Sequence, residues 1–101
     1  MRNFQSVDTE ELKAISQVFK MLGHPKRLRL LFMLLQHSMS VSEISKELNW
    51  EQSAVSHQLQ QLRRYNLVGH TRKGKVVMYH LKNPQAMTLI ADIISHAEQL
   101  V

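Results

Sequence analysis

The sequence predicts a mainly α-helical domain with a two-stranded β-hairpin, in the order helix–helix–helix–helix–strand–strand–helix. Apolar residues recur every three or four positions in five segments, which is the spacing of one helix face. Apolar and β-branched residues also gather in two short segments on either side of a glycine-containing turn, as in a hairpin. A chain of 101 residues has the length of one domain, so we expect residues 1–101 to form a single domain.

The composition narrows the class of protein. An apolar content of 44 % is typical of globular proteins, and the longest apolar run, Leu30–Leu35, is too short to cross a membrane. The first residues have no apolar signal core, so we expect a cytoplasmic protein. The chain has no cysteine, which excludes disulfides and thiolate metal sites. A net charge of +5 favours a polyanionic partner, although many small basic proteins do not bind nucleic acid.

Two helices are predicted at the N-terminal end, over residues 9–22 and 25–36. Asp8 precedes the first helix with acids in the next turn, Gly23 ends it, and Pro25 begins the second. The first turns of the second helix contain three cations, Lys26, Arg27 and Arg29, where positive charge opposes the helix dipole. These cations can pair with Glu10 or Glu11 or approach a phosphate backbone, and we favour pairing with the acids.

A helix-turn-helix is predicted in the middle of the chain. Ser40 and Glu43 have the spacing of a capping box, which predicts a short helix over residues 41–48. A turn follows, and residues 51–64 form the next helix, which Asn66 closes in a left-handed conformation. One side of this helix is a narrow apolar stripe of Val55, Leu59 and Leu62.

The opposite side of the helix over residues 51–64 has no acidic or aliphatic side chain. It carries Gln52, Ser53, Ser56, His57 and Gln60. Such groups both donate and accept hydrogen bonds, as the reading of base edges in the major groove of DNA requires. The alternative is an ordinary solvent-facing surface, because glutamine and serine are common there.

A hairpin follows, with strands over residues 67–71 and 76–81. The turn between them spans residues 72–75, and Gly74 supplies a positive φ. Its other residues, Arg72, Lys73 and Lys75, are all cationic, which suits contact with phosphates or with the minor groove. A charged tip exposed only to solvent is the alternative.

The last predicted helix, over residues 84–100, has a wide apolar stripe, and so does the first helix. One compact core of this size cannot bury both stripes, so we predict that helices 9–22 and 84–100 form the interface of a twofold dimer. The predicted interface residues are Leu12, Ile15, Phe19, Leu89, Ile90, Ile93, Ile94 and Ala97. The alternative is that the two helices cover each other within one chain.

Three segments together resemble the ArsR/SmtB family of winged-helix repressors, and the resemblance extends over the chain from about residue 9. They are residues 19–31 (FKMLGHPKRLRLL), residues 52–59 (QSAVSHQL), and Gly74 followed by residues 79–81 (YHL). The resemblance implies a homodimer that binds a double-stranded DNA operator. Gln52, Ser53, Ser56 and His57 match its base-facing positions, and Arg72, Lys73 and Lys75 match its wing. The chain departs from the family in having Glu51 in place of a capping serine, a role that Asn49 can take, and in having Ala54 in place of a polar residue.

The resemblance also raises the question of a metal inducer, since many members of this family release DNA when a transition metal binds. The positions that correspond to the metal site between the last helices are Asn83, Gln85, His96 and Gln99, and only His96 is a usual zinc ligand. Asp92 lies four residues before His96, on the same helix face. A zinc ion held by Asp92, His96 and their twofold copies is therefore one interpretation, and a surface contact between the two side chains is the other.

The sequence lacks a glycine-rich phosphate loop and a histidine–carboxylate pair beside a nucleophile, so we do not expect an enzyme. We predict a sequence-specific transcriptional repressor that binds a palindromic operator as a homodimer and is released by a metal ion or another inducer. A winged-helix protein-interaction module is one alternative, and a sequence-independent nucleic-acid binder is the other.

Overall fold

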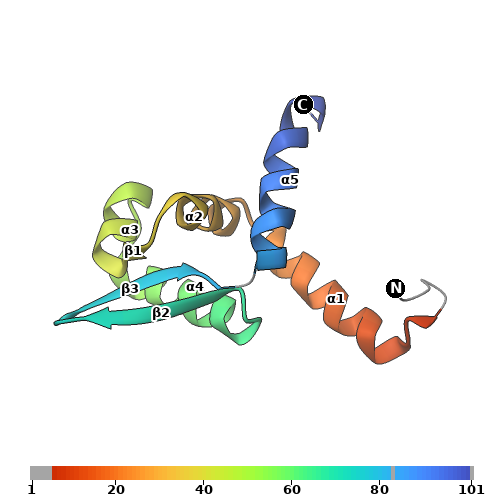
Figure 1. The fold of residues 1–101 in the computed structure, drawn as a ribbon, viewed down its shortest axis with the longest axis horizontal. Helices are drawn as coiled ribbons and strands as arrows, with labels where there is room; N and C mark the ends of the chain where they lie inside the picture. The colour runs from red at the N-terminus through yellow and green to blue at the C-terminus, as the bar shows by residue number, and fades with distance from the viewer. Residues whose placement is uncertain (1–5, 83, 101) are drawn as a thin grey trace.

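The computed structural model describes residues 6–82 and 84–100, and these residues contain five helices and three strands (Figure 1). The elements are α1 (Thr9–Leu22), α2 (Pro25–Gln36), β1 (Met39–Ser40), α3 (Val41–Leu48), α4 (Gln52–Arg64), β2 (Val68–Lys73), β3 (Val76–Leu81) and α5 (Pro84–Leu100). The predicted order of helices and hairpin strands is confirmed. The N-terminal residues 1–5, together with Asn83 and Val101, lie outside the described residues.

Local signals begin and end the first helices. The Asp8 carboxylate accepts a hydrogen bond of 2.8 Å from the backbone N–H of Glu11, which satisfies one of the donors that the start of α1 leaves unpaired. The N–H of Gly23 donates to carbonyls in the last turn of α1, and Pro25 occupies the start of α2. These contacts involve residues at most four apart in the chain, which is why the sequence predicted the helix bounds so closely.

The hairpin pairs β2 with β3 in an antiparallel register, from Val68 opposite Leu81 to Lys73 opposite Val76. The strand β2 therefore runs two residues further into the predicted turn, which is reduced to Gly74 and Lys75, whereas β3 begins at Val76 as predicted. Gly74 has a φ of +65°, a conformation that side chains with a Cβ rarely adopt.

The predicted hairpin is confirmed, and the sheet has a third strand that the sequence did not predict. The short strand β1 pairs with β3, with Met39 opposite Tyr79 and Ser40 opposite Met78, so the sheet has three strands in the order β1-β3-β2. Apolar spacing predicts no strand at Met39, because a strand of two residues has no periodicity to detect. Its pairing depends on a partner forty residues away.

The hydrophobic core lies between the sheet and helices α2, α3 and α4. Six side chains in it are fully buried, namely Leu30, Leu31, Ile44, Val55, Leu59 and Leu62. Three of these come from the predicted stripe of α4, and Met39, Val68 and Leu81 close the core from the sheet. Burial of the stripe turns the other side of α4 outward.

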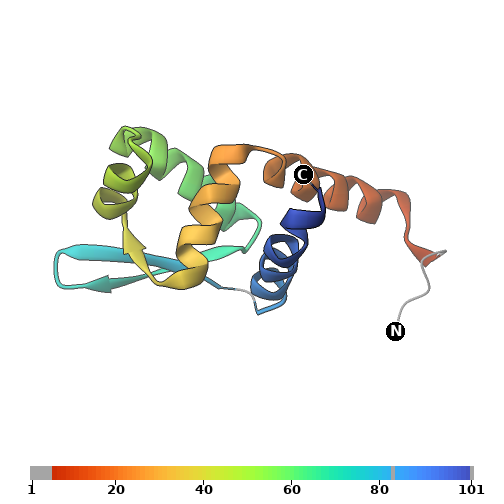
Figure 2. The same cartoon turned by 90° about the horizontal axis from the view of Figure 1, so that it is seen from above.

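Only the end of α1 reaches this core, through Met21 and Leu22, and none of the described side chains of α5 belongs to it. Figure 1 shows α1 extending away from the body of the molecule and α5 rising at an angle to it, and Figure 2 shows the same arrangement from above. The helix α1 packs against α2, whereas α5 packs against α2 and β3. Because Phe19 remains 66 % exposed and Leu89 45 % exposed, the two helices do not cover each other's apolar faces within the chain.

Candidate nucleic-acid interface

The helix α3 and the turn after it hold α4 in place. The backbone N–H of Glu43 donates to the Ser40 hydroxyl at 3.1 Å, and the Glu43 carboxylate accepts from the backbone N–H of Ser40 at 3.0 Å. This reciprocal pair is the predicted capping box. The backbone hydrogen bond from Ser40, reinforced by the one from its hydroxyl, lowers the pKa of the Glu43 carboxyl below its ordinary value.

The predicted cap of α4 is wrong. Asn49 does not cap α4 but ends α3 in the left-handed conformation, with φ of 54°. Glu51 occupies the N-cap of α4, where its side chain accepts no capping hydrogen bond. The turn is held instead through Trp50, whose N–H donates to the Ser45 carbonyl at 3.1 Å and whose carbonyl accepts from the Ser45 hydroxyl.

The polar side of α4 faces outward, opposite the buried stripe. Gln52, Ser53, His57 and Gln60 are exposed, and Ser56 is half-buried at the edge of this surface. The neutral donors and acceptors predicted for base reading are therefore presented together on one helix face. The fold leaves these side chains free to meet a groove of DNA.

Two arginines near the end of α4 extend this surface, and the sequence analysis did not single them out. Arg63, Arg64 and Gln60 line a shallow hollow of about 380 Å³. Arg64 lies four residues after Gln60 and so occupies the same side of the helix. That spacing was the signal that could have identified it. Both arginines are exposed, and guanidinium groups bind phosphates well.

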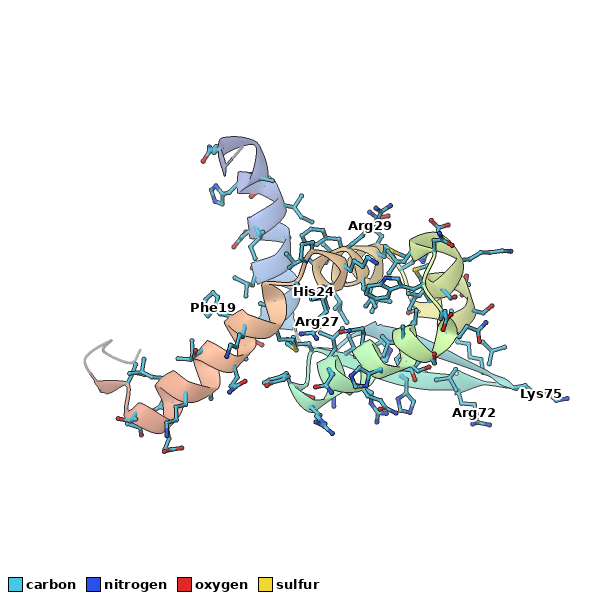
Figure 3. The ribbon with its side chains drawn as sticks, turned by 180° about the vertical axis from the view of Figure 1, so that it is seen from behind. Phe19, His24, Arg27, Arg29, Arg72 and Lys75 are labelled. Carbon is cyan, nitrogen blue, oxygen red and sulfur yellow. The ribbon has the colours of Figure 1, made fainter. Side chains whose placement is uncertain are left out.

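The hairpin lies beside α4, because β2 packs against that helix. Arg72, Lys73 and Lys75 are all exposed, and Figure 3 shows Arg72 and Lys75 near the free end of the hairpin. Successive side chains of a strand point to opposite faces, so Arg72 and Lys73 project to different sides of the wing. Three cations around one tip can therefore contact separate phosphates.

Two of the three cations of α2, Arg27 and Lys26, have partners other than the predicted ones. Arg27 donates through Nε to Oε1 of Gln58 and through Nη1 to the Met21 carbonyl, the latter at 3.2 Å. The Lys26 ammonium lies 5.2 Å from the centre of the Trp50 ring. The preference for pairing with Glu10 or Glu11 is therefore wrong for both. Glu10 instead lies 3.8 Å from Lys13 on the surface of α1.

The residues considered as metal ligands lie on α5. Asp92 and His96 are both exposed. Within residues 6–82 and 84–100, no three histidine, aspartate or glutamate side chains gather closely enough to hold a metal ion. Asn83 lies outside the described residues, and Gln85 and Gln99 offer only neutral amides. Zinc sites use three or four protein ligands, so the described side chains of one chain do not fit a zinc site.

A helix-turn-helix with an exposed polar face, followed by a cationic hairpin that packs beside it, defines the winged-helix class of DNA-binding regulators. Within this class, residues 24–69 match the family model described as bacterial regulatory protein, arsR family. The chain belongs to the arsR family of DNA-binding transcriptional regulators. This confirms the predicted family and the prediction that the protein is not an enzyme.

The chain is similar to two characterised regulators over most of its length. It is 32 % identical over 94 residues to the regulator NmtR of Mycobacterium tuberculosis, covering 93 % of this chain and 78 % of NmtR. It is 31 % identical over 90 residues to the transcriptional repressor SmtB homolog of Synechocystis, covering 89 % of this chain and 68 % of that protein.

The fold is similar to that of solved members as well. The crystal structure of Rv0081 from Mycobacterium tuberculosis superposes with a TM-score of 0.82 at 31 % identity, covering 88 % of this chain and 90 % of that chain. None of the described helices combines the length and the apolar composition needed to cross a membrane.

Proposed function

We propose that the protein is a homodimeric repressor that binds a twofold-symmetric DNA operator in the cytoplasm. The observation that carries the proposal is the exposed polar face of α4 beside the cationic wing. In this arrangement α4 reads base edges through Gln52, Ser53, Ser56, His57 and Gln60. The wing residues Arg72, Lys73 and Lys75, together with Arg63 and Arg64, contact phosphates.

Exposed apolar side chains on α1 and α5 support the dimer. Leu12, Ile15 and Phe19 on α1 and Leu89 and Ile94 on α5 are each more than two-fifths exposed. Ala97 is exposed and Ile93 is half-buried, while the Ile90 side chain lies outside the described residues. Contiguous exposed apolar surface on a small protein marks an interaction site, and a second copy buries it by twofold symmetry.

Repression follows from where such a dimer binds, because a protein seated on an operator over a promoter excludes RNA polymerase. The relative from Synechocystis is described as a transcriptional repressor. A zinc ion at Asp92 and His96 requires the matching pair from the partner subunit, so we assign no release step to a metal.

The test is a binding titration on a duplex selected in vitro from random sequence with the wild-type protein, against a scrambled duplex of the same composition. His57→Ala and Ser53→Ala should weaken binding to the selected duplex only, each by about tenfold, because a base contact contributes roughly 1–3 kcal/mol of discrimination. Lys73→Ala should weaken binding to both duplexes and reduce the salt slope by about one, because it removes a phosphate contact.

A matched control shows whether the loss of affinity comes from a base contact or from the removal of any exposed histidine. His24→Ala removes an exposed histidine that makes no capping hydrogen bond at the start of α2, and it should leave both affinities unchanged. Equal affinity of the wild type for both duplexes would instead indicate a sequence-independent binder. If the wild type binds DNA so weakly that no duplex can be selected, the protein is a protein-interaction module instead.

A further inference from the structure

One arginine connects the helix proposed for dimerisation with the helix proposed for DNA recognition. Arg27, in the first turn of α2, lies near the junction of α1 and α2 on the side facing α4 (Figure 3). Its guanidinium donates to the Gln58 side chain of α4 and to the Met21 carbonyl near the end of α1. A guanidinium has donors in several directions within one rigid plane, so a single arginine can hold both acceptors at a set separation.

The two helices are otherwise separated at this place. A cleft of about 220 Å³ lies between them, and it is lined by Gln17, Lys20, Met21, Arg27, Gln61 and Tyr65. The main packing partner of α1 is α2 rather than α4. Arg27 lies in this cleft and forms hydrogen bonds to both of the helices that border it, to Met21 of α1 and to Gln58 of α4.

The position of Arg27 is unfavourable for α2 itself, which suggests that it serves another purpose. Positive charge in the first turn of a helix opposes the helix dipole, and α2 has no acid there to compensate. The neighbouring Lys26 also contacts the recognition region, since it stacks on Trp50, two residues before α4 begins. The first turn of α2 thus contacts the turn before α4 through Lys26 and the middle of α4 through Arg27.

Gln58 is suited to be a fixed point on α4. It is half-buried on the flank of the helix, between the apolar stripe and the polar face, so it is not available to read bases. It lies directly after His57 and one turn after Ala54, within the same helical segment as the predicted base contacts. A contact that fixes Gln58 in place therefore also fixes the exposed polar side of α4.

We propose that Arg27 is a positioning residue that sets the place of α4 relative to α1, and thereby the spacing of the half-sites that the dimer accepts. This inference rests on the proposed function, because it assumes that α1 packs at the dimer interface. In a twofold dimer, any change in the position of α4 relative to α1 occurs in both subunits. Both changes alter the separation of the two recognition helices. Half-sites of helix-turn-helix dimers are about 34 Å apart, so a shift of one base pair is easily resolved by affinity.

The first arm of the test measures the separation of the two α4 helices without DNA. The chain has no cysteine, so Arg64→Cys places one spin label per subunit on the exposed end of α4. In this background, Arg27→Ala and Gln58→Ala should each broaden the distribution of distances between the two labels. Their combination should broaden it no further than either alone, because both remove the same contact. Gln58→Ala changes no charge and keeps a strong helix former in α4.

The second arm measures spacing preference on DNA, with the selected duplex and a version that has one base pair inserted between its half-sites. Arg27→Ala and Gln58→Ala should reduce the preference of the wild type for the uninserted duplex by about tenfold, the effect of one charge-assisted hydrogen bond. Arg29→Ala is the matched control. Arg29 is an exposed cation on the same helix that points away from α4 (Figure 3), so its loss should affect both duplexes equally and leave the spacing preference and the label distances unchanged.

The outcomes separate this inference from the function on which it rests. A clear distance signal whose width is the same in Arg27→Ala, Gln58→Ala and the wild type, with unchanged spacing preference, overturns the positioning role and leaves the dimer intact. The absence of any signal between labels in the otherwise wild-type protein overturns the dimer, and the positioning role with it. Broadening together with relaxed spacing supports both.

Discussion

The proposed dimer can be tested most sharply at Phe19, by the substitution Phe19→Ala. The ring is 66 % exposed, so of roughly 200 Å² for an aromatic side chain about 130 Å² remains available for a partner. At about 25 cal/mol per Å², covering this area stabilises a dimer by about 3 kcal/mol per ring and about 6 kcal/mol for two symmetry-related rings. This is an upper value, because the ring need not be covered completely in the dimer.

Even half of this stabilisation corresponds to a rise of about a hundredfold in the dimer dissociation constant. Sedimentation velocity over a range of protein concentrations measures that constant, and circular dichroism checks that the variant is folded. Val76→Ala is the matched control, since Val76 is also an exposed apolar residue, at 49 %, but lies on the hairpin. If folded Phe19→Ala dimerises as tightly as the wild type, α1 does not form the interface.

Three further predictions concern stability and metal binding. The Glu43 pKa is lowered on folding, so the ionised carboxylate stabilises the fold above the ordinary pKa of 4.5. This stabilisation is lost as pH falls through the lowered pKa. The difference in the free energy of unfolding between the wild type and Glu43→Gln, measured with urea, should therefore shrink over the same fall in pH. Leu59→Ala empties a fully buried site and should lower the free energy of unfolding by about 2–5 kcal/mol, whereas a loss under about 1 kcal/mol would contradict its place in the core. The dimer should bind zinc too weakly to compete with a fluorescent chelator, because no three histidine, aspartate or glutamate side chains gather within the described residues of one chain; tight binding that His96→Gln abolishes would refute this.

Except for the cap of α4, the helix-end features that depend on neighbouring residues were predicted correctly from the sequence. The Asp8 cap, the glycine that ends α1, the Ser40–Glu43 capping box and the left-handed Asn66 each involve contacts within one helical turn or a single backbone conformation. Such features follow from residue types and their spacing, because the chain has few ways to satisfy the unpaired groups at a helix end.

Features that depend on distant segments were missed or misread. The strand β1 exists only because Met39 and Ser40 meet β3, and nothing in two residues indicates a partner so far along the chain. The sequence favours pairing of Arg27 with an acid on α1, because opposite charges attract. The fold instead brings the Gln58 side chain and the Met21 backbone carbonyl within hydrogen-bond distance of Arg27.

The helices, the hairpin, the family and the polar composition of the face opposite Val55, Leu59 and Leu62 could all be read from the sequence. The spacing of apolar residues along a helix specifies which side is buried, whatever the helix packs against. The packed fold was needed to show that Ser56 lies at the edge of that face, that Phe19 stays exposed, and that Arg27 joins α1 to α4. These depend on the positions of helices relative to one another, and contacts among all of them set those positions together.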